Sequence, residues 1–200
     1  MNGIERKVDI PLKYLDYLGR ARVGVVGGGI LIKMLQKWGF KEIVVLERNV
    51  QEEQLYMDPF YHESDLGSFP TYQTLLKSEV TSYPLPDSIQ GIKSKLKGID
   101  IVIGCYEQEK AALASEELGA PFITSGIVCT VLPEGIKFSE LLIPELKTNI
   151  SLTTVIRAVQ SLESVKVISG FGEPVFAPYG IEIDMINHQL KKIRLDVNKK

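Results

Sequence analysis

Three consecutive glycines stand where a strand-like segment meets a helix-like one. The apolar segment RVGVV (22–26) runs into Gly27, Gly28 and Gly29, and the helical pattern ILIKMLQKW (30–38) follows. Glycine is costly to order, so three in a row indicate a turn whose backbone must come close to another group. The N–H groups of such a turn, together with the positive end of the helix dipole, can bind a phosphate.

An acidic residue follows at the spacing that a nucleotide site requires. Glu47 ends the next apolar segment, EIVVLE (42–47), about twenty residues after the glycines. A carboxylate at the end of that strand can accept hydrogen bonds from both hydroxyls of a ribose. The glycines and Glu47 together predict a nucleotide-binding site.

The third glycine of the dinucleotide fingerprint is absent, because Ile32 stands three positions after Gly29. Two other interpretations therefore stay open. The glycines can form a tight turn that binds no ligand, or the turn can bind NAD.

The order of apolar and helical segments predicts a parallel sheet with helices on both faces. Strand 22–26, helix 30–38 ended by Gly39, and strand 42–47 form a βαβ unit. Residues 48–70 have no clear period, so they form a functional loop or contain short helices, and a helix is expected near Thr71. The remaining segments are strands at 78–83, 99–105 and 121–127, helices at 88–97 and 109–118, an edge strand at 137–144, a helix at 151–168 and a hairpin at 180–197. We expect one domain over residues 1–200, a three-layer Rossmann-like α/β fold whose mostly parallel sheet ends in an antiparallel C-terminal hairpin.

The composition argues against several classes of protein. The formal net charge is −2, so nothing draws the chain to nucleic acid or to an anionic membrane surface. No window approaches about 18 uncharged apolar residues, and the first residues, MNGIERKVDI, lack the apolar run of a signal peptide, so we expect a cytoplasmic protein. Cys105 and Cys129 are the only cysteines and form no CxxC pair, which predicts two reduced thiols and no thiolate zinc site.

An ordered set of motifs resembles the ubiquitin-activating superfamily, whose bacterial members ThiF and MoeB are the closest in size. The motifs are RVGVVGGG, EIVVLE, DLG (65–67), GIDIVIGCYEQ (98–108), APFITSGI (120–127) and the helix–GFGEP–hairpin ending of the chain. The resemblance implies a ThiF-like fold and a homodimer. It also implies that ATP and Mg²⁺ are used to adenylate a carboxylate, with release of pyrophosphate.

The resemblance assigns roles to particular residues. Gly27 and Gly29 match the first two glycines of the nucleotide loop, and Glu47 matches the acid that holds the ATP ribose. Glu107 matches the aspartate that binds magnesium, one methylene longer, and a carboxylate oxygen suits that ion. Arg6 sits where the family has an arginine that reaches the partner subunit's ATP phosphates. The stretch that aligns with the family's Cys-Thr-Asp-Asn is Cys105-Tyr106-Glu107-Gln108.

The chain departs from the family in its cations. The family's Asn-x-x-Arg stretch reads Gln54 to Met57 here, which keeps an amide and removes the arginine. The lysine that follows the DLG turn is missing near Thr71. Losing two cations should cost several kcal/mol of transition-state stabilisation. Either other residues compensate, or the chain binds ATP and reacts slowly. The candidates for compensation are Arg48, His62 and Lys77.

The family's zinc cysteines and its crossover-loop cysteine are also missing, so the expected product is a free or handed-over acyl-adenylate. The short, zinc-free form resembles the ThiF-like enzymes of methanogens in iron–guanylylpyridinol (FeGP) cofactor biosynthesis. That resemblance implies a small-molecule carboxylic acid, the carboxymethyl group of guanylylpyridinol, and a partner protein that accepts the acyl group. Two other functions stay open: an NAD(P)-dependent oxidoreductase, and a non-catalytic nucleotide-binding or scaffold protein.

Overall fold

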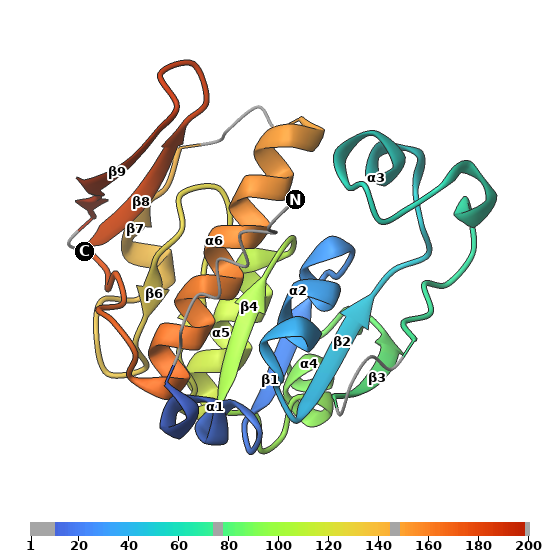
Figure 1. Cartoon of the computed structure of the whole chain (residues 1–200), viewed down its shortest axis with the longest axis horizontal. Coiled ribbons are helices and arrows are strands. Elements are labelled where there is room, and N and C mark those ends of the chain that lie inside the picture. Colours follow the sequence, from blue (N-terminus) through green and yellow to red (C-terminus); the bar gives the residue numbers. More distant parts are fainter. Residues whose placement is uncertain (1–10, 74–77, 145–148, 199–200) are drawn as a thin grey trace, which may run out of the picture.

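A six-stranded sheet forms the centre of the molecule (Figure 1). The computed structural model describes residues 11–73, 78–144 and 149–198. The strand order is β3-β2-β1-β4-β5-β6, in which the first five strands are parallel and β6 is antiparallel to β5. In sequence order the strands are β1 (Arg22–Val26), β2 (Glu42–Glu47), β3 (Glu79–Pro84), β4 (Ile101–Gly104), β5 (Phe122–Ile123) and β6 (Thr130–Val131).

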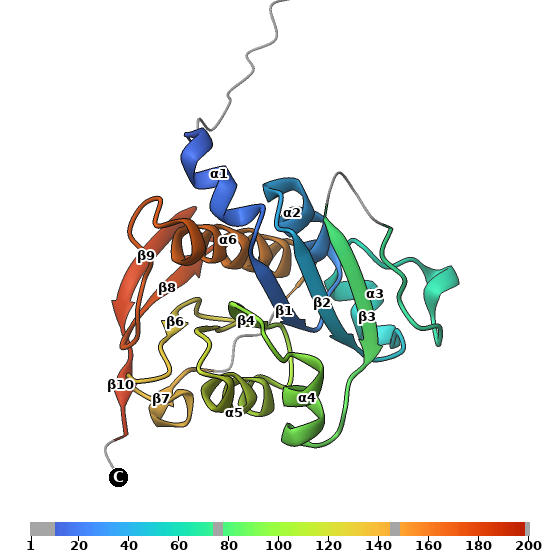
Figure 2. The same cartoon turned by 90° about the horizontal axis from the view of Figure 1, so that it is seen from below.

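Helices cover both faces of this sheet, which gives the three layers that the sequence predicts (Figure 2). One face carries α1 (Leu12–Leu18), α2 (Ile30–Trp38) and α6 (Ile150–Ser169). The other face carries α4 (Ile89–Lys95) and α5 (Gln108–Leu118). The central strands are buried on both faces, which is why β1, β2 and β4 are apolar almost throughout.

Local signals end and begin the helices where the sequence indicates. Gly39 and Gly119 adopt the left-handed conformation after α2 and α5, which glycine reaches without steric cost. Asn149 caps α6 by accepting a hydrogen bond from the amide of Leu152 at 2.9 Å. These signals place the predicted helices correctly to within a residue or two.

The structure differs from the prediction in several places, and α1 (Leu12–Leu18) forms where no helix is predicted. Residues 48–70 contain the short helix α3 (Glu52–Met57) and a 3₁₀ turn, η1 (Glu63–Asp65), which agrees with the predicted short helices, but the helix expected near Thr71 does not begin within residues 71–73. The segment 121–127 pairs only over β5, because the chain turns at Gly126, where φ is +79°. The expected edge strand at 137–144 is a 3₁₀ turn, η2 (Phe138–Glu140), followed by the two-residue strand β7 (Leu141–Leu142), which pairs with β10 (Asp196–Val197).

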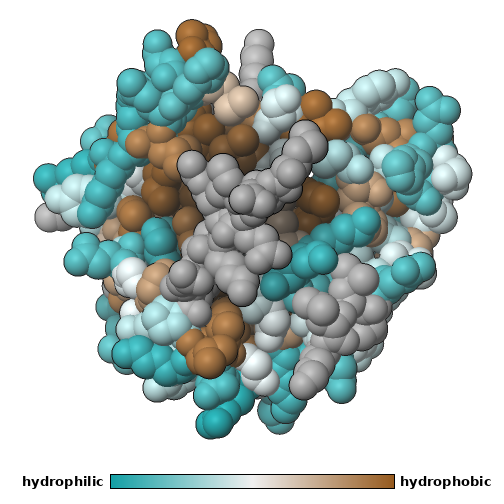
Figure 3. Space-filling model, viewed as in Figure 1, coloured by the Kyte–Doolittle hydropathy of each residue, from teal (hydrophilic) through white to brown (hydrophobic). Residues whose placement is uncertain are grey.

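The C-terminal hairpin forms, but not as the edge of the main sheet. Its strands β8 (Tyr179–Asp184) and β9 (Gln189–Arg194) pair only with each other, and the antiparallel edge of the main sheet is β6. His188 lies in the hairpin turn with φ of +52°. Hydrophobic residues gather on the surface between the hairpin and α6 (Figure 3). No helix within the described ranges is long and apolar enough to cross a membrane.

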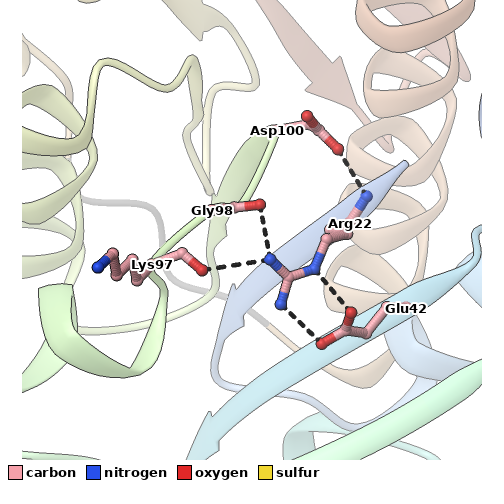
Figure 4. Close-up of polar contacts among 5 residues, drawn as sticks. All are labelled: Arg22, Glu42, Lys97, Gly98 and Asp100. Atoms are coloured by element: carbon pink, nitrogen blue, oxygen red, sulfur yellow. Dashed lines mark hydrogen bonds and ion pairs between the residues drawn. The ribbon is translucent and has the colours of Figure 1, made fainter. Parts of the chain in front are cut away.

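Arg22 joins three strands at the amino end of the sheet, opposite the ends where ligands bind in such folds (Figure 4). Its guanidinium donates to both carboxylate oxygens of Glu42 on β2, at 2.6 and 2.9 Å, and to the carbonyl oxygen of Gly98 at 2.9 Å. The Arg22 amide donates to Asp100 at 2.8 Å. These contacts fix the spacing of β2, β1 and β4 and therefore play a structural role.

Replacing Arg22 by lysine should destabilise the fold without touching the functional site. An ammonium group cannot reproduce the planar fork that holds Glu42 and Gly98, so the free energy of unfolding should fall by about 1–2 kcal/mol in urea titrations. The matched control is Arg20→Lys, because Arg20 is exposed nearby. Equal stability of the two variants would contradict the structural role of Arg22.

Candidate functional site

A pocket of about 350 Å³ opens at the carboxyl ends of β1 and β4. Here the strand order reverses, because β2 lies on one side of β1 and β4 lies on the other. Such a switch point is where open α/β sheets bind ligands. The pocket is lined by residues from the glycine turn, the segment after β2, α3, the segment after β4, and α6, among them Gly28, Arg48, Gln54, Tyr106, Glu107 and Arg157.

The first glycine is required by close packing within the protein. Gly27 has φ of +90°, and a Cβ atom there would lie 2.6 Å from Cys105 Cβ and from the Tyr106 ring. Its amide donates to the carbonyl oxygen of Leu46 at 2.9 Å. Gly27 therefore allows the segment after β4 to pack against the turn.

The other two glycines make room for side chains from the segment after α3. A Cβ atom at Gly28 would overlap the hydroxyl of Tyr72, and one at Gly29 would overlap the carboxylate of Asp58. The Gly29 amide donates to Tyr72 Oη at 2.9 Å, and the Ile30 amide donates to Asp58 Oδ1 at 3.1 Å. Asp58 thus occupies the position at the start of α2 where the sequence predicts a phosphate.

Glu47 is completely buried beneath the same side chains. Its Oε2 atom accepts hydrogen bonds from the hydroxyls of Tyr61 and Tyr72, both at 3.1 Å, and its Oε1 atom accepts one from the Arg48 amide at 3.3 Å. Burial raises the pKa of Glu47 to about 7. A ribose that binds Glu47 must take the place of a tyrosine hydroxyl.

Glu107 lies at the pocket with two cations beside it. It precedes α5 in the left-handed conformation, with φ of +50°, which is uncommon for a residue with a side chain. Its carboxylate forms ion pairs with Lys110, at 3.2 Å, and with Arg48. Hydrogen bonding to Lys110 and the positive charges of Arg48 and Lys110 lower its pKa. The group is therefore an ionised carboxylate at neutral pH.

The donor set at Glu107 suits magnesium only in combination with a nucleotide. No three His, Cys, Asp or Glu side chains of the described residues are placed to share a metal ion. Mg²⁺ commonly binds through one or two carboxylates, water and substrate phosphates. Glu107 fits that pattern as a single ligand, and binding the ion would cost its ion pairs with Arg48 and Lys110.

Arg157 of α6 lines the pocket and Gln160 of the same helix holds it in place, and neither role is predicted from the sequence. Arg157 donates to Ser125 Oγ at 2.9 Å and to Gln160 Oε1 at 2.8 Å. Gln160 donates to the carbonyl oxygens of Gly104 and Thr124, both at 2.9 Å, and so holds the ends of β4 and β5. The apolar period of 151–168 hides a second stripe of buried polar residues at helical spacing, and that stripe is the signal that could have found them. It comprises Thr153, Arg157, Gln160, Ser161 and Ser164.

The remaining candidate residues lie in or near the pocket, or outside the described ranges. Gln54 lines the pocket and accepts a hydrogen bond from the Gln51 amide at 2.8 Å. His62 lies apart, against a second cavity of about 430 Å³. Arg6 and Lys77 fall outside the described residues, so their expected roles stay predictions.

Neither cysteine forms a disulfide, as the sequence predicts. Burial raises the pKa of the Cys105 thiol to about 12 and that of Cys129 to about 11. Both are therefore thiols at neutral pH. Cys105 contributes to the pocket wall and Cys129 to the core.

The raised pKa of Glu47 predicts a pH-dependent stability. The folded protein binds a proton that the unfolded chain releases near pH 4.5, so the free energy of unfolding should fall as the pH rises from there to about 7. In the Glu47→Gln variant, the free energy of unfolding should fall over this pH range by up to about 3 kcal/mol less than in the native protein. Urea titrations between these pH values measure it, with the exposed Glu63→Gln variant as the control. A Glu47→Gln profile parallel to that of the native protein would show that Glu47 ionises normally.

Comparison with known proteins finds likeness in structure only. No family model matches the sequence, and no curated protein matches it. Among solved structures, E. coli MccB with ATP matches with a TM-score of 0.76, 16% identity and coverage of 93% of this chain and 66% of MccB. PaaA matches with a TM-score of 0.70, 12% identity and coverage of 92% of this chain and 67% of PaaA.

A further match is the microcin C7 biosynthetic enzyme MccB in complex with N-formylated MccA, with a TM-score of 0.73 and 15% identity. It covers 94% of this chain and 68% of that one, so the chain spans about two thirds of the length of these proteins. The chain therefore has a Rossmann-like fold of the ThiF type, as the sequence predicts.

Proposed function

We propose that the chain binds ATP in the pocket at the switch point and transfers its adenylyl group to a carboxylate, releasing pyrophosphate. The observation that carries this proposal is the placement of Glu107 and Arg48 beside Gly28 at the carboxyl ends of β4, β2 and β1. One ligand in this pocket could therefore contact both a carboxylate suited to a metal ion, Glu107, and a cation suited to phosphate, Arg48. The structural likeness to MccB, which was solved with ATP, supports the same ligand.

The positions of Asp58 and Tyr72 limit where the phosphates can lie. Both side chains occupy the start of α2, and a phosphate there would meet the carboxylate of Asp58. We place the triphosphate instead along Gly28, Arg48 and Glu107, which line the open pocket. Glu47 would hold the ribose once Tyr72 gives up its hydrogen bond.

The proposed reaction is a direct displacement. An oxygen of the substrate carboxylate attacks the α-phosphorus, a bond forms between them, and the bond from the α-phosphorus to the bridging oxygen of pyrophosphate breaks. The nucleophile is already ionised at neutral pH, so no general base is needed. Arg48 binds phosphate oxygens, and Mg²⁺ held by Glu107 would offset their negative charge.

The proposal extends to the substrate, the acceptor of the acyl group and the oligomeric state. The substrate would be a small-molecule carboxylic acid such as guanylylpyridinol in FeGP cofactor biosynthesis, and a partner protein would accept the acyl group. The active unit would be a homodimer in which Arg6 reaches the partner's ATP and Lys77 supplies a further cation. Two of the exposed apolar residues of the hairpin, Ile186 and Leu190, are available for such an interface.

One observation favours a second function, that of a non-catalytic member of the fold. The carboxylate of Asp58 already accepts the hydrogen bond of the Ile30 amide at the start of α2, where a phosphate would otherwise bind. Met57 stands where the family has an arginine. A protein of this kind would bind ATP without dependence on magnesium, or would bind no nucleotide.

The magnesium dependence of ATP binding tests the role of Glu107. Calorimetric titration of the native protein should give about tenfold tighter ATP binding with MgCl₂ than with EDTA, and Glu107→Gln should remove that difference. The control is Glu109→Gln, because Glu109 is an exposed residue of the first turn of α5, two residues after Glu107. ATP binding without any effect of magnesium would support the non-catalytic function, and tight NAD binding with ATP ignored would contradict the proposal.

The Tyr72→Phe variant tests the place of the ribose. Removing this hydroxyl frees the Gly29 amide and removes one of the two hydrogen bonds to Glu47 Oε2, so ATP should bind about three- to tenfold more tightly. Tyr56→Phe is the matched control, because Tyr56 is an exposed tyrosine of α3 that does not line the pocket. Weaker ATP binding by Tyr72→Phe would place the nucleotide elsewhere.

A further inference from the structure

Arg157 is a buried cation that forms no ion pair within the described residues. Only 9% of the residue is exposed. Burying a charge without a partner is expensive, and arginine is rarely buried unless it is paired. Because Arg157 lines the pocket, an anionic ligand can supply the missing charge.

The Nη1 group of its guanidinium has two hydrogen-bond partners, whereas the edge formed by Nε and Nη2 is nearly free. Nη1 donates to Ser125 and Gln160, at 2.9 and 2.8 Å. Nη2 has a single distant contact, 3.5 Å from the carbonyl oxygen of Cys105, and the buried Nε atom has no hydrogen-bond partner. The Nε–Nη2 edge is a planar fork, and its two parallel N–H groups match the two oxygens of a carboxylate.

The fork is held in place before any ligand arrives. Gln160 accepts from Arg157 and is itself fixed by the carbonyl oxygens at the ends of β4 and β5. A preorganised cation loses little entropy when it binds. Ile156 and Tyr61 also line the pocket, so part of its wall is apolar or aromatic.

We infer that the free edge of Arg157 binds the carboxylate of the acid that is adenylated, an inference that rests on the proposed function. The charge of the pocket favours a carboxylate over a phosphate at this wall. Burial raises the pKa of Asp58, and the positive charge of Arg157 lowers it, so the two groups interact electrostatically. The carboxylate of Asp58 offsets part of the positive charge of Arg157, so this wall suits a monoanion, whereas the more highly charged triphosphate is better matched by Arg48, Lys110 and Mg²⁺.

This placement also suits the reaction. The lone pairs of the carboxylate that face the guanidinium are engaged, and those on the opposite side stay free to attack phosphorus. Holding the acid on α6 and the nucleotide at Glu107 brings the two reactants together within one pocket. Arg157 would thus act as a substrate-binding residue.

Nuclear magnetic resonance of the arginine side chains tests this directly. In ¹⁵N-arginine-labelled protein, the Nε–Hε signal of Arg157 is identified by its loss in Arg157→Lys, or by its shift in Ser125→Ala if the first variant fails to fold. Sodium acetate should move this signal saturably, and sodium chloride at equal ionic strength should not. Calorimetry should give at least about tenfold weaker acetate binding for Arg157→Lys. Arg194→Lys, on the exposed face of β9, should bind acetate as the native protein does.

The other outcomes are distinct. Movement with inorganic phosphate and none with acetate would overturn the assignment to a carboxylate, and movement with neither would remove the anion site altogether. Mg-ATP is titrated separately and read at the Nε–Hε signal of Arg48. An unchanged Arg48 signal together with an acetate response at Arg157 would refute the proposed function and leave the anion site standing.

Discussion

The close approach of side chains to the glycine turn is the constraint on which the rest of the site depends. Any side chain at Gly28 or Gly29 would overlap Tyr72 or Asp58, and Gly27 gives the same room to Tyr106. Three segments far apart in sequence therefore converge on the end of β1. Their convergence buries Glu47, orders the segment after β2 and leaves an open pocket on the side of β4.

This packing changes the meaning of a glycine-rich turn. A strand, a run of glycines and a helix usually indicate that the backbone comes close to a phosphate. Here the amides of Gly29 and Ile30 donate to a tyrosine and an aspartate of the same chain. The positive end of α2 is thus already compensated, and the charged groups that could meet a ligand in the open part of the pocket include Arg48, Glu107 and Arg157. These three come from three different elements, so the pocket is polar at several walls and not only at the turn.

The sequence predicted the elements that depend on local pattern and missed the contacts that depend on distant residues. The apolar run at 22–26 and the left-handed glycines at 39 and 119 act locally, so strands, helices and their order could be predicted. Asp58 lies 28 residues from Ile30, and nothing in the spacing of either predicts their hydrogen bond. The apolar spacing of residues 151–168 predicts an amphipathic helix with its polar side chains in solvent, whereas Arg157 and Gln160 of α6 are buried.

A crystal structure of the protein with Mg²⁺ and a non-hydrolysable ATP analogue tests the central claim most directly. The claim is that the pocket between β1 and β4 holds the triphosphate. We predict the α-phosphate next to Gly28, the metal on Glu107, and Arg48 moved from Glu107 to a phosphate oxygen. A nucleotide bound elsewhere, with the Arg48–Glu107 ion pair intact, would contradict it.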